Sequence, residues 1–261
     1  MRTIAFVTQK GGAGKSTLAS SVAVAARAAG ERVFIADLDP LQTLVKWSGA
    51  RESSDIGVEH VPPGKLAKAI AALEKKGVTL VVIDAPGHEG EAAAAAIRAA
   101  DLCVIPARPN AFDLWASEKT RAGVKEAGVD YAFLLNQCPP AQQTARVELG
   151  AKALQAMGGL LAPLVSARVD YQEAARLGLG VTEYNPEGVA AEEMKELWGS
   201  IKRRLKRAPA KTAPAKITPA KQAVVEKPAP APKAAPQKAA AAKPAVEAPK
   251  SAPKKPARKA A

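Results

Sequence analysis

A short glycine-rich segment near the N-terminus constrains the fold of this chain more than any other part of its sequence. The segment reads TQKGGAGKST over residues 8–17, after an apolar run at residues 4–8 and at the start of a helical pattern at residues 15–29. Glycines allow a tight turn whose N–H groups point inward, and the N-terminus of the following helix adds a positive dipole. A strand, an anion-binding turn and a helix are therefore expected in this order, as in a phosphate-binding loop.

The side chains of this loop match the other contacts that a bound triphosphate needs. Lys15 is expected to supply positive charge to the β- and γ-phosphates, the Ser16 hydroxyl to ligate Mg²⁺, and the Thr17 hydroxyl to donate to the α-phosphate. The predicted nucleotide-binding residues of the loop are Gly11, Gly12, Ala13, Gly14, Lys15, Ser16 and Thr17. A glycine-rich turn with incidental lysines is the alternative, and the strand–loop–helix setting argues against it.

Apolar runs and helical patterns alternate through residues 1–207. The runs expected to form strands are residues 4–8, 33–37, 78–84, 102–106, 132–136 and 160–165. The expected helices include residues 15–29, 64–75, 112–127, 143–157 and 186–207. Runs such as LVVID and AFLLN are apolar on both faces, as in strands that helices cover on both sides. We predict an α/β fold with a doubly wound, mostly parallel sheet and helices on both faces, the P-loop NTPase arrangement.

Acidic residues follow two of these runs. Asp37 and Asp39 lie in VFIADLDPLQ, and Asp84 ends the run VVID. The carboxyl ends of parallel strands form the ligand-binding edge of such a sheet. Asp84 is therefore expected beside the metal, where it holds a metal-bound water or accepts a hydrogen bond from Ser16. Pro86 and Gly87, which follow shortly after Asp84, fit a mobile switch segment that could sense the γ-phosphate.

Taken in order, these motifs resemble the ParA/MinD family of ATPases over residues 1 to about 207. The letters QKGGAGKST resemble the deviant Walker A motif of this family, and Gln9 at its first position is typical of the ParA branch. In the family, the lysine before the paired glycines, here Lys10, reaches the nucleotide held by the other subunit. The resemblance implies an ATP-dependent homodimer, slow ATP hydrolysis that a partner protein stimulates, and ATP and Mg²⁺ as cofactors.

The resemblance also assigns roles to the acidic residues. The letters DLDPLQ resemble the DxDPQ motif of the family, on which match Asp39 positions or activates the attacking water and Asp37 supports the Mg²⁺ shell. Leu41 stands where the family has Gln, so no role of that Gln is carried over. The predicted catalytic residues are Lys10, Lys15 and Asp39, and the predicted metal residues are Ser16, Asp37 and Asp84. A solvated turn is the alternative for Asp37 and Asp39.

One later residue receives a binding role from the same resemblance. Asn136, at the end of the run AFLLN, matches the residue that reads the adenine edge. Because Asn at a strand end is often only a turn former, that role stays open as an alternative. Arg168 and Tyr171 also fit the family pattern, and no catalytic role is assigned to them.

Positive charge is concentrated at the C-terminal end of the chain. The net charge is +13, and residues 209–261 contain twelve Lys or Arg residues and two Glu residues. This segment is rich in Ala, Pro and Lys and has no aromatic residue, so it cannot bury enough apolar surface to offset the entropy cost of ordering. We predict an ATPase domain at residues 1–207 and a disordered basic tail at residues 208–261. The charge predicts a polyanionic partner, DNA before membrane, with a solubilising linker as the alternative.

The last expected helix is amphipathic. Its apolar residues recur at three- and four-residue spacing, which predicts a face that docks on the core, with a membrane-binding face as the alternative. The helix ends in a cationic cluster of Lys202, Arg203, Arg204, Lys206 and Arg207. We predict that this cluster contacts DNA phosphates; a favourable interaction with the helix dipole is the other interpretation.

Together with the family resemblance, these features predict a cytoplasmic, nucleoid-associated ATPase that binds DNA non-specifically as an ATP dimer. On the family resemblance it positions a plasmid, a chromosome or a protein cluster, and a ParB-like or other partner stimulates hydrolysis. A MinD-like ATPase that cycles on a membrane is the main alternative, although no apolar run is long enough to span a bilayer and no membrane contact is expected. An iron-protein electron donor would need a Cys after Asp84, where this chain has PGH. A binding module without turnover is the third alternative.

Overall fold

The computed structural model describes residues 1–141 and 144–207, so the predicted basic tail at residues 208–261 lies outside the described residues. Within them, six strands form one sheet in the order β3-β2-β4-β1-β5-β6. The strands are β1 (Arg2–Phe6), β2 (Val33–Asp37), β3 (Gly57–His60), β4 (Leu80–Asp84), β5 (Leu102–Ala107) and β6 (Asp130–Leu135). Every neighbouring pair is parallel. The predicted α/β fold with a parallel sheet is therefore confirmed.

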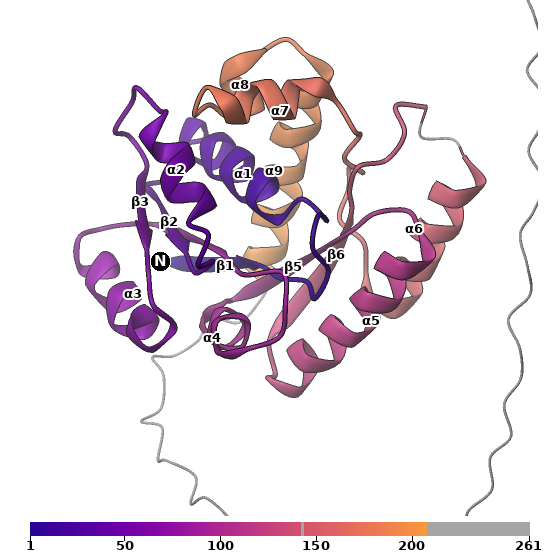
Figure 1. The fold of residues 1–261 in the computed structure, drawn as a ribbon, viewed down its shortest axis with the longest axis horizontal. Coiled ribbons are helices and arrows are strands. Elements are labelled where there is room, and N and C mark those ends of the chain that lie inside the picture. Colours follow the sequence, from indigo (N-terminus) through magenta and orange to yellow (C-terminus); the bar gives the residue numbers. More distant parts are fainter. Residues whose placement is uncertain (142–143, 208–261) are drawn as a thin grey trace, which may run out of the picture. The chain divides into compact units, whose positions relative to one another are not determined.

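Helices cover both faces of this sheet (Figure 1). One face carries α1 (Lys15–Ala28), α2 (Thr43–Gly49), α7 (Val169–Arg176), α8 (Val181–Tyr184) and α9 (Val189–Arg207). The other face carries the short 3-10 helix η1 (Pro63–Lys65), α3 (Leu66–Lys75), α4 (Glu91–Ala99), α5 (Ala111–Glu126) and α6 (Ala145–Gly158). None of the helices in the described ranges is long and apolar enough to cross a bilayer.

Each face of the sheet has its own hydrophobic core, because successive side chains of a strand point to opposite faces. Ile4 and Phe6 of β1 pack in the core that α1 and α9 cover. Ala5 and Val7 pack in the core beneath α4 and α5. All four are almost completely buried. This double burial explains why the strands are apolar throughout instead of alternating with polar residues.

The segment at residues 160–165 is not a strand of this sheet, which corrects one prediction. Leu160 pairs with Phe133 only as an isolated parallel bridge, although the segment runs beside β6 and Leu161 N donates to the Phe133 oxygen at 2.8 Å. Pro163 interrupts the ladder because proline has no N–H group to donate. The helix expected from residue 143 begins at Ala145, and residue 143 lies outside the described range.

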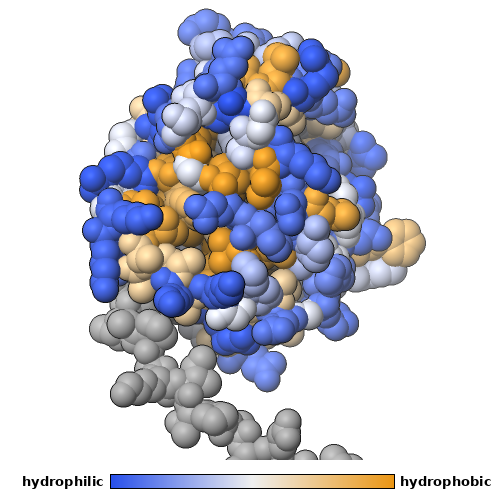
Figure 2. Space-filling view, turned by 60° about the vertical axis from the view of Figure 1, so that its left-hand side comes forward, coloured by the Kyte–Doolittle hydropathy of each residue, from blue (hydrophilic) through white to orange (hydrophobic). Residues whose placement is uncertain are grey.

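Strand β3 was not predicted from the sequence, because its four residues do not form an apolar run. Gly57 and Glu59 are exposed and Val58 and His60 are half-buried, as suits a strand at the edge of the sheet. A Cβ atom at Gly57 would lie 2.8 Å from the Phe34 ring, so glycine allows this close pairing with β2. Figure 2 turns this side of the molecule forward and shows apolar side chains gathered among a mostly hydrophilic surface.

Candidate functional site

The segment after β1 folds into a turn that leads directly into α1. Gly12 and Gly14 adopt positive φ angles of 77° and 90°, a region that residues with a side chain rarely adopt. In the described ranges, the N–H groups of residues 11–17 donate no hydrogen bond to another group of the protein. Because they lie at the positive end of α1, they suit an anion.

Two neighbouring strands bring acidic residues to the end of β1, where this turn begins. Asp84 of β4 is in register with Phe6 of β1 on one side and with Asp37 of β2 on the other. The carboxyl ends of these strands therefore lie side by side, at the edge where such sheets bind ligands. The Ser16 hydroxyl donates a 2.6 Å hydrogen bond to Oδ2 of Asp84, which is one of the two contacts that the sequence left open for Asp84.

Burial dominates the electrostatics of Asp84. Its side chain is fully buried, and its Oδ1 atom has no hydrogen-bond partner among the described residues. Burial raises the pKa of Asp84 to about 7; the Ser16 hydrogen bond opposes this shift and the charge of Asp37 adds to it. Burial also lowers the pKa of Lys15, against the attraction of Asp84 and Asp39.

These features fit a hydrated Mg²⁺ ion. No group of three or more His, Cys, Asp or Glu side chains in the part of the chain that the structure describes is placed to hold a metal. Mg²⁺ in nucleotide sites often takes one or two protein oxygens together with phosphate oxygens and water. The Ser16 hydroxyl and the unpartnered Asp84 Oδ1 supply oxygens of this kind, and a nearby cation would favour the ionised form of Asp84.

The other two carboxylates stabilise the turn that follows β2. Asp37 Oδ2 accepts hydrogen bonds from the N–H groups of Leu44 and Val45, and Asp37 Oδ1 accepts one from Asp39 N. Asp37 therefore caps the start of α2, and this geometry leaves it less suited than Asp84 to a metal shell. Asp39 is partly exposed; its Oδ1 accepts from Leu41 N at 2.9 Å, and its Oδ2 accepts no hydrogen bond from the described residues.

Two residues after β6 hold the phosphate-binding turn from the opposite side. Asn136 is buried and its Nδ2 donates to the Ala13 oxygen at 2.8 Å, while Gln137 Nε2 donates to the Gly12 oxygen at 2.9 Å. The sequence predicted a base contact for Asn136 and gave no role to Gln137. In the structure, the amide nitrogen of Asn136 is directed at the loop.

A pocket of about 520 Å³ lies beside Asn136 and Gln137. Its walls come from the start of α1, from Asn136 and Gln137, and from the segment that leads into α7. Thr17, Ser166, Arg168 and Tyr171 are among the lining residues. The volume and the mixture of apolar and polar walls suit a nucleoside-sized ligand.

Lys10 lies at the rim of the turn. It is half-buried, and its side chain makes no ion pair or hydrogen bond with any described residue. Nearby, Arg108 forms a two-bond ion pair with the buried Asp113 at the start of α5, with N···O distances of 2.8 and 3.1 Å. A Cβ atom at Gly12 would lie 3.8 Å from the Arg108 guanidinium, so this ion pair borders the loop.

The segment after β4 packs against the phosphate-binding turn. A Cβ atom at Gly87 would lie 3.2 Å from Lys15 Nζ and 3.3 Å from Gly11 Cα. A larger residue at position 87 would therefore require one of the two segments to shift by a few tenths of an ångström. This contact agrees with a switch segment that senses what the loop holds.

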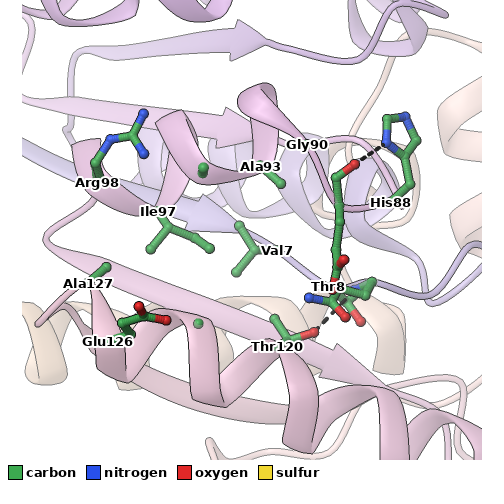
Figure 3. A pocket seen from close by; sticks show the side chains of 14 residues that line it. Val7, Thr8, His88, Gly90, Ala93, Ile97, Arg98, Thr120, Glu126 and Ala127 are labelled. Carbon is green, nitrogen blue, oxygen red and sulfur yellow. Dashed lines mark hydrogen bonds between the residues drawn. The ribbon is translucent and has the colours of Figure 1, made fainter. Parts of the chain in front are cut away.

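A second hollow of about 490 Å³ lies between α4 and α5. Figure 3 shows Ile97 and Arg98 of α4 across from Thr120 and Glu126 of α5, with Val7 between the two helices. Gln9 N, at the end of the hollow nearest the loop, donates to Thr120 Oγ1 at 3.2 Å. The hollow therefore adjoins the loop without opening onto the Ser16–Asp84 pair.

The five cations at the end of α9 differ in whether they form an ion pair within the domain. Lys202 pairs with Glu31 at 2.8 Å, and Arg204 pairs with Asp130 at 2.8 Å, so both are engaged within the domain. The remaining cations, Arg203, Lys206 and Arg207, are exposed, and Arg203 donates only to the neutral Ser200 hydroxyl.

The sequence matches a known protein family along most of its length. The family model described as the CobQ/CobB/MinD/ParA nucleotide binding domain matches residues 4–215. The chain belongs to the ParA/MinD family. Members of this family are nucleotide-binding ATPases, in agreement with the loop, the Ser16–Asp84 pair and the sheet topology described above.

Curated and solved relatives agree with the family assignment. A "Maintenance of carboxysome distribution protein A" from Gloeobacter kilaueensis is 32% identical over 193 residues, which cover 70% of this chain and 85% of that protein. Apo McdA from Cyanothece has a TM-score of 0.67 at 15% identity, covering 78% of this chain and 99% of that one. MinD with Mg-ADP from Pyrococcus horikoshii has a TM-score of 0.63 at 20% identity, covering 80% and 99%. At these identities the two solved structures show the shared ParA/MinD fold.

Proposed function

We propose that this ParA/MinD-family protein is a positioning ATPase whose ATP-bound homodimer binds DNA and whose hydrolysis of ATP releases it. One observation carries the dimer part of the proposal: Lys10 lies beside the phosphate-binding turn with no partner in the described chain. A half-buried lysine whose ammonium group has no counter-charge among the described residues is available to bind an anion. In a face-to-face dimer, that anion is the nucleotide of the other protomer.

The site within one protomer holds ATP by its phosphates and its nucleoside. The free N–H groups of residues 11–17 and the Lys15 ammonium surround the phosphates. Ser16 and Asp84 would hold a Mg²⁺ ion, whose charge would neutralise the phosphate oxygens. The nucleoside occupies the pocket beside Thr17, where the Oδ1 atom of Asn136 remains for the base while its Nδ2 braces the loop.

Hydrolysis of ATP needs an aligned water molecule more than it needs covalent chemistry. Asp39 is placed for this role because its Oδ2 atom accepts no bond from the described chain and because it lies close enough to Lys15 to influence its pKa. Asp37, committed to the start of α2, acts by holding the segment that carries Asp39.

The DNA-binding part of the proposal rests on charge. Arg203, Lys206 and Arg207 are exposed at the end of α9, and twelve further Lys or Arg residues follow in residues 209–261. Dimerisation doubles this cationic surface, so ATP binding raises the affinity for a polyanion. The contacts are to phosphates, so we expect binding that is independent of sequence and weakens steeply with salt.

The cargo is proposed from the relatives. Because a curated relative is named for carboxysome distribution, a protein assembly is the cargo that we favour, with a plasmid or chromosome as the other possibility. A ParB-like or other partner protein would stimulate hydrolysis, and the protein would act on the nucleoid in the cytoplasm.

The MinD-like alternative requires an apolar surface for the membrane. The apolar face of α9 is not free for this purpose: Met194, Leu197, Trp198, Ile201 and Leu205 are all at most 5% exposed and belong to the core. This burial favours DNA over a membrane as the surface on which the ATPase cycles.

The decisive experiment compares Lys10→Ala with Lys125→Ala, a lysine on the exposed face of α5. Light scattering with Mg·ATP should show dimers for the wild type and for Lys125→Ala, and monomers that still bind ATP for Lys10→Ala. Only the two dimeric proteins should sediment with DNA, and none should sediment with anionic vesicles. Normal dimerisation and ATP hydrolysis by Lys10→Ala would refute the contact between Lys10 and the nucleotide of the other protomer. ATP-dependent sedimentation of the wild type with vesicles would support the MinD-like alternative.

A further inference from the structure

A buried carboxylate on α9 reaches the wall of the nucleoside pocket from behind. Glu193 is only 7% exposed. Its Oε1 accepts hydrogen bonds from Ser166 Oγ at 2.9 Å and from the Arg168 guanidinium at 3.1 Å, and its Oε2 accepts one from Ser166 N at 3.2 Å. Ser166 and Arg168 both line the pocket. The Glu193 side chain of α9 therefore contacts two residues of that wall, Ser166 and Arg168.

The same wall is also held by backbone hydrogen bonds to the residues that follow β6. On its far side, Ala167 N donates to the Cys138 oxygen at 2.7 Å and Cys138 N donates to the Val165 oxygen at 3.0 Å. These backbone bonds hold the chain beside the end of β6 but do not involve the side chains of the wall. Glu193 fixes the orientation that the backbone bonds do not, because it holds Ser166 by both its N–H and its hydroxyl.

Two polar groups of the wall have no hydrogen-bond partner in the described part of the chain. Tyr171 lines the pocket and is 8% exposed, and its hydroxyl has no hydrogen-bond partner within the described ranges; the same holds for the buried Nε atom of Arg168. Buried donors without acceptors cost free energy, so natural proteins rarely keep them without a purpose. A nucleoside presents acceptor atoms on its base and its ribose that such donors suit.

We propose that Glu193 is a positioning residue for the nucleoside end of the bound nucleotide, acting through Ser166 and Arg168, with the Tyr171 hydroxyl as a direct contact to the nucleoside. This inference rests on the proposed nucleotide site. It extends that site to α9, a helix that the phosphate-binding motifs do not reach, and it assigns the recognition of the nucleoside to a cluster separate from the recognition of the phosphates.

The experiment compares two ligands that share the phosphate site. Mg·ATP uses both the loop and the pocket, whereas inorganic triphosphate with Mg²⁺ uses the loop alone. Titration calorimetry would give the affinities of the full-length wild type, Glu193→Gln and Tyr171→Phe for both ligands. The matched control is Glu192→Gln, the same chemical change at the exposed neighbouring residue of α9. Ser166→Ala, which removes one of the two bonds from Ser166, serves if Glu193→Gln does not fold.

Glu193→Gln and Tyr171→Phe should each weaken Mg·ATP by about tenfold, the usual effect of one buried polar contact, and leave inorganic triphosphate unchanged. Glu192→Gln should change neither affinity. An equal loss of both ligands in Glu193→Gln would show a general effect on the fold and overturn the inference, as would unchanged binding of Mg·ATP. If the wild type bound neither ligand, the proposed nucleotide site itself would fail, which is a distinct result.

Discussion

The side-chain amide of Asn136 donates a 2.8 Å hydrogen bond to the carbonyl oxygen of Ala13, so the end of β6 holds the phosphate-binding turn across 123 positions of sequence. The contact is close: a Cβ atom at Gly14 would lie 2.4 Å from the same amide nitrogen. Gly14 therefore serves two purposes, since it supplies the positive φ angle of the turn and leaves space for Asn136. The shape of the turn depends on a residue outside the glycine-rich motif.

Replacing Asn136 by Ala should loosen the turn and weaken every ligand that binds through phosphates. We expect inorganic triphosphate to lose affinity by roughly tenfold, because a buried carbonyl group loses its donor, and Mg·ATP to lose more, because the base also loses its contact with Asn136 Oδ1. Titration calorimetry with the two ligands measures this. A loss for Mg·ATP alone would instead assign Asn136 to the base, as the family resemblance implies. Gln137→Ala, which removes the more exposed bond to Gly12, is the companion variant and should have the smaller effect.

The sequence predicted the parts of the site that short motifs encode. The glycine turn and the strand that ends in Asp84 can each be recognised from about ten consecutive residues. The fold class then predicts that the strands are parallel, so that the end of β1 at Phe6 lies beside Asp84. Their meeting in the Ser16–Asp84 hydrogen bond was therefore foreseeable. The apolar character of the strands likewise predicted a sheet covered on both faces.

Other parts depend on contacts that no local pattern records. Gln137 and Glu193 reach their partners across more than 20 residues, and nothing in their neighbours marks them. Strand β3 is half-exposed and so lacks an apolar run, while residues 160–165 have the run but contain Pro163, which cannot donate to a ladder. The motif also did not predict that Asp37 caps α2. A carboxylate at the end of a strand can either bind a metal or accept hydrogen bonds from the start of the next helix, and the sequence does not distinguish the two.

The raised pKa of Asp84 predicts a dependence of stability on pH. The pKa is about 7 in the folded protein and 3.8 in the unfolded chain, so between these values the folded state holds a proton that the unfolded state has lost. The free energy of unfolding should therefore fall as pH rises from about 4 to about 7, by at most about 1.4 kcal/mol per pH unit from this group, and level off above pH 7. Urea unfolding of wild type and Asp84→Asn at pH 5, 6, 7 and 8 isolates the effect as the difference between the two proteins. A difference that stays constant over this range would contradict the raised pKa.

Ligand binding should reverse this protonation. Mg·ATP favours ionised Asp84, so binding at pH 6 should release more protons from the wild type than from Asp84→Asn. Calorimetry in two buffers of different ionisation enthalpy measures the released protons. At pH 8, where Asp84 is already ionised, the two proteins should release the same number.

The close approach of Gly87 to the loop predicts that Gly87→Ala impairs the site. The added methyl group would meet Lys15 Nζ at 3.2 Å and Gly11 Cα at 3.3 Å; the lysine can move aside but the backbone of the turn cannot do so freely. We expect kcat/KM for ATP to fall by about tenfold, in the range that overpacking by one methyl group costs. Gly64→Ala is the control, since a Cβ atom there meets nothing within 4 Å. If both variants hydrolyse ATP at the wild-type rate, the segment after β4 does not need its contact with the loop.

The division of the α9 cations predicts which of them bind DNA. Arg203, Lys206 and Arg207 are exposed, whereas Lys202 and Arg204 are tied to Glu31 and Asp130. Replacing the three exposed cations by Gln should reduce the slope of log affinity against log salt by up to about 2.7 per protomer, and so by up to about 5.4 for the ATP-bound dimer, since each phosphate contact contributes about 0.9. Fluorescence anisotropy with a labelled duplex at several salt concentrations measures the slope.

Two control variants test whether the salt dependence of DNA binding depends on the position of these cations or only on the net charge of the protein. The triple variant of Lys68, Lys75 and Lys76 to Gln removes the same charge from α3 and its C-cap residue, on the other face of the sheet, and should leave the slope unchanged. Arg204→Gln should lower the melting temperature instead, because its guanidinium joins α9 to Asp130 and to the Tyr131 carbonyl at the start of β6. Should the α3 variant reduce the slope as much as the α9 variant, the end of α9 would have no special place in DNA binding, and the attraction would belong to the net charge of the chain.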